Sequence, residues 1–243
     1  IETTAELVLA TSALKEKDPT LVGLAYDVDD LFFHAPWLLG AGGSLLKDDG
    51  FTFDQPPYLD GFVSSLDLVK GWVRKGVVLP DASYDRVKDK FKRGKIAYVL
   101  SGPWFATGLK TGTYGVTTLP QIGGVDGPKA RPLMSVEGGY VSRFSQQKSK
   151  AVALLRFLSS KEEAERRKIV TQQIVTRTDT RATEDPILAA FETQLTWAVP
   201  TPNSPKMKAL WTPLNRVLAE VIVRDQDPKA AIEEARRLLE RGE

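Results

Sequence analysis

Two tryptophans stand where an aromatic ring could take part in ligand binding. Trp104 follows a predicted strand in the run Ser101-Gly102-Pro103-Trp104-Phe105, and Trp211 ends the segment Met207–Trp211. The flat face of an indole packs on the C–H face of a sugar ring, while carboxylates and amides bind the hydroxyls at its rim. Spacing alone favours core or half-buried roles for both rings, so a sugar-binding role stays open at this point.

Several carboxylates are candidates for polar contacts. Asp27, Asp29 and Asp30 precede an apolar stretch with helical character, and Glu137 stands before Gly138-Gly139-Tyr140. Acidic residues in front of a helix commonly cap it and complement its dipole. The alternatives are hydrogen bonds to sugar hydroxyls, or glycoside hydrolysis by Glu137 with one acid of Asp27–Asp30. Hydrolysis requires two carboxyls at a set separation with opposed protonation, which the sequence does not fix.

Other chemistries find little support. The chain has no cysteine and a single histidine, His34, which lies in an apolar stretch and is predicted to be structural. The glycines at 40–43 and 123–124 lack the lysine of a P-loop and the spacing of a dinucleotide-binding loop. We therefore expect no metal and no cofactor.

Composition places the chain among ordinary globular proteins. It has 243 residues, 42% of them hydrophobic, with 33 basic against 31 acidic side chains. Because no basic block is interleaved with aromatics, nucleic acid is not expected as a partner. No apolar run approaches the roughly 20 residues of a membrane span, and no signal peptide is recognised. The start at Ile1, without an initiator methionine, leads us to expect a processed protein or a piece of a longer one.

Hydrophobic periodicity and breakers predict an α/β protein, since strands alternate with helices. Pro36 and Pro213 are expected to kink or break their helices, and the Gly- and Pro-rich stretch 123–132 is the candidate linker. The predicted strands are 21–26, 51–53, 96–100, 114–119 and 136–141. The predicted helices are 4–17, 31–39, one opened by Pro57, one around 87–91, 151–158, 162–170, 186–197, 206–223 and one after 228.

A set of short segments follows one another in a characteristic order along nearly the whole chain. They are Thr3–Glu6, Asp30–Gly43, Phe91–Gly94, Ser101–Trp104, Tyr114–Pro120, Met207–Trp211 and Asp227–Ala231. In this order and spacing the chain resembles the sugar-binding proteins of ABC importers, of the maltose and maltodextrin-binding type. The resemblance implies a periplasmic-binding-protein-like lobe of type II, with a mixed sheet flanked by helices and closure by hinge bending.

The resemblance also implies roles for individual residues. Trp104 and Trp211 match aromatic residues that stack on glucosyl rings, and Asp30 matches an acidic residue that binds hydroxyls. Phe32 stands where the family has a tyrosine, so it lacks that hydroxyl.

Helix 206–223 departs further from the family pattern. Thr212 stands where the maltose binder has a second aromatic residue. Asn215 stands where it has an arginine, with Arg216 one position later. These departures point away from maltose itself as the ligand.

The resemblance starts well inside the family's chain. It implies that residues 1–125 and 200–243 form the second, C-terminal lobe, and that residues 126–199 cross into an incomplete first lobe. Leu154, Phe157, Leu158 and Ile169 would then lack a sheet to cover, so we expect them to expose apolar surface, pack anomalously or meet another chain.

The leading hypothesis is a protein that binds an oligosaccharide, a maltodextrin-like α-glucoside, for delivery to an ABC importer without turnover. The importer's membrane subunits would be its partners, and its location periplasmic or otherwise extracytoplasmic, including a membrane-anchored lipoprotein. The full-length protein would be a monomer, with association of the fragment as an alternative.

The competing hypotheses are a carbohydrate hydrolase and a scaffold or signalling domain whose tryptophans contact a protein. The candidate ligand-binding residues are Trp104, Trp211, Asp30, Phe32, Glu137, Asn215 and Arg216.

Overall fold

The computed structural model describes residues 1–80, 82–110, 112–171, 173–181 and 183–242. The chain forms two compact units, each made of segments that are separated in the sequence. Unit 1 comprises Ile1–Ser101, Leu119–Leu133 and Trp197–Glu243, and unit 2 comprises Gly102–Thr118 and Met134–Thr196.

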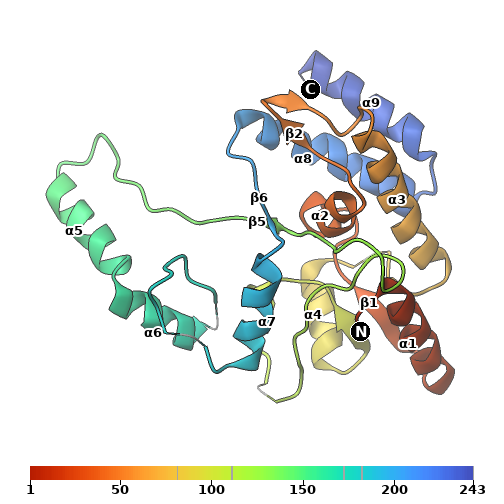
Figure 1. Ribbon diagram of the computed structural model, residues 1–243, viewed down its shortest axis with the longest axis horizontal. Helices are drawn as coiled ribbons and strands as arrows, with labels where there is room; N and C mark the ends of the chain where they lie inside the picture. The colour runs from red at the N-terminus through yellow and green to blue at the C-terminus, as the bar shows by residue number, and fades with distance from the viewer. Residues whose placement is uncertain (81, 111, 172, 182, 243) are drawn as a thin grey trace. The chain divides into compact units, whose positions relative to one another are not determined.

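A short parallel sheet forms one part of unit 1 (Figure 1). Strand β1 (Val22–Ala25) pairs with β4 (Ile96–Val99), with Val22 opposite Ile96, and Val78 adds an isolated parallel bridge to Leu24. Helices α1 (Thr4–Lys17) and α4 (Tyr84–Lys92) contact these strands. This parallel pair with flanking helices confirms the predicted α/β class.

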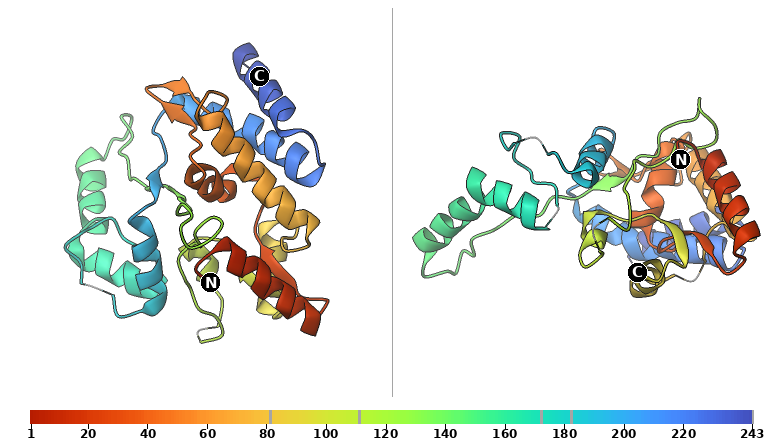
Figure 2. Two further views of the ribbon diagram at one scale, coloured as in Figure 1. Left: turned by 45° about the vertical axis from the view of Figure 1, so that its right-hand side comes forward. Right: turned by 90° about the horizontal axis from the view of Figure 1, so that it is seen from below.

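The other part of unit 1 is helical (Figures 1 and 2). It contains α2 (Leu31–Gly40), α3 (Tyr58–Arg74), α8 (Pro205–Leu218), the π-helix η2 (Ala219–Val223) and α9 (Pro228–Arg241). A hairpin of β2 (Leu46–Lys47) and β3 (Gly50–Phe51) lies between α2 and α3 in sequence. Apolar residues at helical spacing on α3 and α8 meet in one core. Its fully buried members include Leu31, Phe62, Leu66, Leu210, Leu214 and Leu218.

Side-chain caps set the helix starts that the sequence predicts. Thr3 Oγ1 accepts from Glu6 N at 3.1 Å, and Asp227 Oδ1 accepts from Ala230 N at 2.8 Å. Thr3 and Glu6 have the spacing of a capping box, but only half of one forms, because the Glu6 carboxylate accepts from Glu2 N rather than from Thr3 N. Asp30 and Asp185 cap α2 and α7 (Pro186–Leu195) in the same manner.

The two internal prolines do not break their helices, and the kink that the sequence predicts as the alternative stays a prediction. Pro36 lies inside α2 and Pro213 inside α8, and both are buried. Each proline removes one backbone hydrogen bond. In α2 that loss is offset by the burial of Leu31, Ala35 and Leu38, none of which has exposed surface.

Unit 2 contains the 3₁₀-helix η1 (Pro103–Ala106) and helices α5 (Lys148–Leu158), α6 (Lys161–Thr171) and α7. Lys168 of α6 is buried, and its ammonium binds Glu192 Oε1 of α7 at 2.6 Å and the Arg181 carbonyl at 3.2 Å. Strands β5 (Leu133–Met134) and β6 (Val199–Pro200) form a short pair where the chain passes between units.

The apolar surface expected on α5 and α6 is confirmed. Leu154 and Phe157 are 56% and 57% exposed, and Ile169 is 78% exposed, with Leu158 also on the surface. An amphipathic helix buries its apolar stripe against another layer. Within the described part of unit 2, that layer is missing for these side chains.

Two predicted strands and the predicted linker are wrong. Residues 114–119 and 136–141 have no strand, and among described residues no backbone hydrogen bond joins 136–141 to a neighbour. Gly139 nevertheless lies so close to α5 that a Cβ there would come within 2.4 Å of Leu155.

The stretch 123–132 is no linker, because Ala130 is fully buried in unit 1 and Arg131 N donates to the Pro36 carbonyl. No helix in the described ranges is long and apolar enough to cross a membrane.

Candidate functional site

Polar groups collect at the carboxyl edge of the parallel strand pair in unit 1. Asp27 follows β1 closely, and Ser101 follows β4. A tight turn, closed by Asp30 N donating to the Asp27 carbonyl at 3.3 Å, leads from β1 into α2. The Ser101 hydroxyl oxygen is buried and makes no hydrogen bond with any residue that the structure describes. Ligands of open α/β sheets bind outside this edge. The position of Ser101 shortly after β4 is therefore the signal by which the sequence could have named it as a candidate binding residue.

Asp27 has an unusual environment. Burial, the side chain of Asp29 and the charge of Asp30 raise the pKa of Asp27 to about 7. A carboxyl with such a pKa exchanges its proton near neutral pH and serves as a donor or an acceptor accordingly. The turn therefore offers a polar surface whose charge changes with pH.

Asp27→Asn is expected to stabilise unit 1 by about 1 kcal/mol at about pH 8, after allowance for solvent screening. The pKa of Asp27 is higher in the folded chain, about 7, than in the unfolded chain. The wild type therefore loses stability as the pH rises from about 4 to about 7, and the variant avoids that loss. Urea unfolding at about pH 4.5 and about pH 8 checks this, with the exposed Asp67→Asn as control. An equal difference at both pH values would contradict it.

The junction of α2 and α8 brings together four of the predicted site residues. Asn215 Oδ1 accepts from Leu31 N at 2.9 Å, and Asp30 Oδ1 accepts from Phe32 N at 2.7 Å. Trp211 precedes Asn215 by one helical turn and so shares its face of α8. Trp211 and Phe32 are both half-buried and pack on the core of unit 1. An indole and a carboxylate next to a sheet's carboxyl edge are suited to a flat polyhydroxyl ligand.

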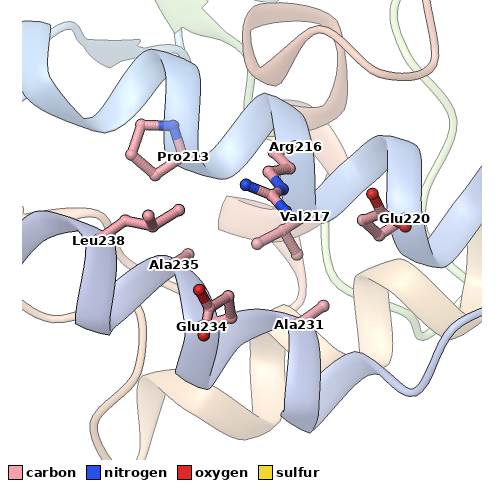
Figure 3. A pocket seen from close by; sticks show the side chains of 8 residues that line it. All are labelled: Pro213, Arg216, Val217, Glu220, Ala231, Glu234, Ala235 and Leu238. Atoms are coloured by element: carbon pink, nitrogen blue, oxygen red, sulfur yellow. The ribbon is translucent and has the colours of Figure 1, made fainter. Parts of the chain in front are cut away.

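Arg216 is turned away from this junction. It lines a cavity of about 70 Å³ between α8 and α9, together with Pro213, Glu220 and Glu234 (Figure 3). One residue along a helix rotates the side chain by about 100°, so Asn215 and Arg216 cannot serve the same face. The structure thus separates the two residues that the resemblance places together.

The other two predicted residues, Trp104 and Glu137, belong to unit 2. Trp104 lies in η1 and is 40% exposed, with its ring folded over Gly102, where any Cβ would meet the indole at 2.1 Å. Glu137 is exposed in the irregular stretch that was expected to be a strand. That Trp104 and Trp211 share one ligand stays a prediction.

His34 is structural, as predicted. Its side chain has no exposed surface, and Nε2 lies 3.0 Å from the Ser65 hydroxyl, which donates to the Phe62 carbonyl at 2.7 Å. That arrangement assigns the ring proton to Nε2. Burial lowers the pKa of His34 to about 3, so the ring is neutral at physiological pH.

A comparison with protein families matches residues 1–191 to a family described as bacterial extracellular solute-binding protein. The chain belongs to this family. A galactooligosaccharide-binding protein of Bacillus subtilis is 25% identical over 235 residues, covering 91% of this chain and 55% of that relative. A maltooligosaccharide ABC transporter solute-binding lipoprotein of Streptococcus pneumoniae is 25% identical over 215 residues. That match covers 84% of this chain and 48% of the lipoprotein. The chain therefore spans about half the length of the curated relatives it matches.

Solved structures agree with this assignment. A cyclo/maltodextrin-binding protein complexed with maltotetraose superposes with a TM-score of 0.80 at 23% identity, covering all of this chain and 64% of that one. An extracellular solute-binding protein of Staphylococcus aureus in complex with maltose gives 0.78 at 25% identity, covering 65% of its length. These similarities confirm the expected fold, that of type II periplasmic binding proteins.

Proposed function

We propose that this chain is part of an oligosaccharide-binding protein that delivers its ligand to an ABC importer. The observation that carries the proposal is its similarity, over 84% of the chain or more, to proteins named for binding oligosaccharides. Those relatives bind solutes, and we propose that this chain likewise binds without turnover. An α-linked glucosaccharide is the ligand class we favour.

The geometry of unit 1 supports this proposal. The α2–α8 junction supplies one half-buried indole, Trp211, and one carboxylate, Asp30, whose Oδ2 makes no hydrogen bond with a described residue. The aromatic face would take the C–H side of a sugar ring and the carboxylate its hydroxyls. Trp104 and Glu137 would contribute from unit 2.

The proposal extends to domains, partners and location. Residues 1–125 and 200–243 would belong to the C-terminal lobe, and residues 126–199 to a segment that enters the first lobe. The importer's membrane subunits would be the partners, and the location extracytoplasmic, either in the periplasm or on a lipid anchor. The full-length protein would act as a monomer.

Titration of the chain with three neutral tetrasaccharides tests the proposal. Tryptophan fluorescence should respond to maltotetraose with a dissociation constant on the order of 1 mM, because this chain spans only part of its relatives' length. Cellotetraose, which is β-linked, should give a weaker response, and a β-galactotetraose serves as the third arm. No change in tryptophan fluorescence with any of the three would contradict oligosaccharide binding. A response to the galactoside alone would overturn the choice of an α-glucoside as the ligand class.

A further inference from the structure

The resemblance assigns Asn215 to the ligand, but its side chain is already engaged within unit 1. Its Oδ1 accepts a hydrogen bond from Leu31 N at 2.9 Å, which joins two residues 184 positions apart in the chain. Leu31 is the first residue of α2, where a helix leaves its amide groups without an internal partner. Asn215 therefore caps a helix other than its own.

The remaining amides of the first turn of α2 are engaged as well. Phe32 N donates to the Asp30 carboxylate at 2.7 Å. Phe33 N and His34 N donate to the Asp30 backbone carbonyl at 3.1 and 3.0 Å. No amide at this helix start is left for a ligand, so the turn would contribute to binding through its carboxylates, among them that of Asp30.

The bond from Asn215 also relates two groups of the proposed site. Trp211 lies one turn before Asn215 on the same face of α8, and Asp30 immediately precedes Leu31 in the chain. Fastening Asn215 to Leu31 N therefore fixes where the Trp211 indole lies relative to the Asp30 carboxylate. The fully buried Leu31, Leu210 and Leu214 belong to one apolar core, so loss of this single bond should loosen the α2–α8 junction locally without unfolding unit 1.

We infer that Asn215 is a positioning residue of the proposed saccharide site: it contacts no ligand, and sets the spacing between the Trp211 indole and the Asp30 carboxylate by capping α2. The inference rests on the proposed function. A ring that must meet an aromatic face and a carboxylate together is sensitive to small changes in their separation.

Two substitutions separate positioning from direct contact. Asn215→Ala removes the acceptor, and Asn215→Asp keeps an acceptor oxygen at the same place but removes the amide N–H groups that could bind a ligand. Lys208→Ala, an exposed change on the same helix, is the matched control. Two readouts are needed: the hydrogen-exchange rate of the Leu31 amide, and the affinity for maltotetraose by NMR titration.

We expect Asn215→Ala to speed exchange at Leu31 at least tenfold and to weaken maltotetraose binding about fivefold, since the positions of both groups relax. Asn215→Asp should retain both Leu31 protection and affinity to within about twofold. Lys208→Ala should change neither.

Equal loss of affinity in both Asn215 variants, with Leu31 still protected in Asn215→Asp, would show a direct ligand contact and overturn the inference. Full affinity in Asn215→Ala despite fast exchange at Leu31 would reduce Asn215 to a structural cap and overturn it too. A wild type that ignores every saccharide would instead reject the proposed function on which the inference rests.

Discussion

Gly61→Ala is expected to destabilise unit 1 by about 3 kcal/mol and to lower its melting temperature by about 6–12 °C. Gly61 lies in the first turns of α3, where the helix backbone touches the loop that ends α2. A Cβ at this position would come within 2.3 Å of Gly43 N, 2.7 Å of the Ala41 carbonyl and 2.7 Å of the Gly42 carbonyl carbon. Backbone atoms on three sides cannot give way as a flexible side chain would, so α2 and α3 must separate.

Gly71→Ala in the same helix provides the control. Apart from the adjoining backbone of α3 itself, no atom lies within 4 Å of a Cβ built there, so alanine adds helix propensity without a clash. We expect a gain of about 0.5–1 kcal/mol. Thermal unfolding followed by circular dichroism compares the two variants. Similar melting temperatures for both would show that α3 and the 41–43 loop are not in close contact.

Trp211→Ala is expected to weaken maltotetraose binding by ten- to thirtyfold, equivalent to about 1.4–2 kcal/mol. The indole is the only aromatic ring among the predicted site residues of α8, and it is half-buried against the core, which holds its plane in place. Alanine removes the flat face on which a sugar ring would stack. NMR titration at up to tens of millimolar ligand measures the loss.

Trp211→Phe is the matched variant, because it keeps an aromatic face at the same place. It should recover most of the affinity that alanine loses. Hydrogen exchange at core amides in Trp211→Phe should match the wild type, because phenylalanine keeps an aromatic ring packed on the core. Unchanged affinity in Trp211→Ala would remove Trp211 from the site.

Local signals predicted the helices well because their determinants are local. Caps such as Thr3 and Asp227 lie next to the amides they serve, and the apolar spacing of α3 is visible over its own length. Pro36 shows the limit of that approach. Its cost is local, but Leu31, Ala35 and Leu38 beside it are buried only because α2 packs on α3 and α8, which are distant in sequence.

Strands were predicted less well, because a strand exists only with a neighbour. Residues 136–141 have apolar character, yet Val136 and Tyr140 are 64% and 92% exposed and no ladder forms. The segment 123–132 misled in the opposite direction. Its glycines and prolines resemble a linker, but Ala130 fills a site in the core that only tertiary structure could show.

The site was predictable in part. The resemblance assigned ligand contacts to both Asn215 and Arg216, whereas helical period alone already separates adjacent residues by about 100°. The bond from Asn215 to Leu31 could not be foreseen, since no local pattern links residues 184 positions apart. The environment of Asp27 likewise depends on the turn that brings Asp29 against it.

The most direct test of oligosaccharide binding at the α2–α8 junction is an NMR titration that observes the indole N–H signals of the five tryptophans. Trp211→Phe assigns its own signal by deletion, and the buried Trp37 and Trp72 act as internal references. We predict that maltotetraose shifts the Trp211 signal in a saturable manner while those of Trp37 and Trp72 stay in place. A Trp211 signal that does not move at tens of millimolar maltotetraose, or that moves no more than the two buried references, would contradict the account.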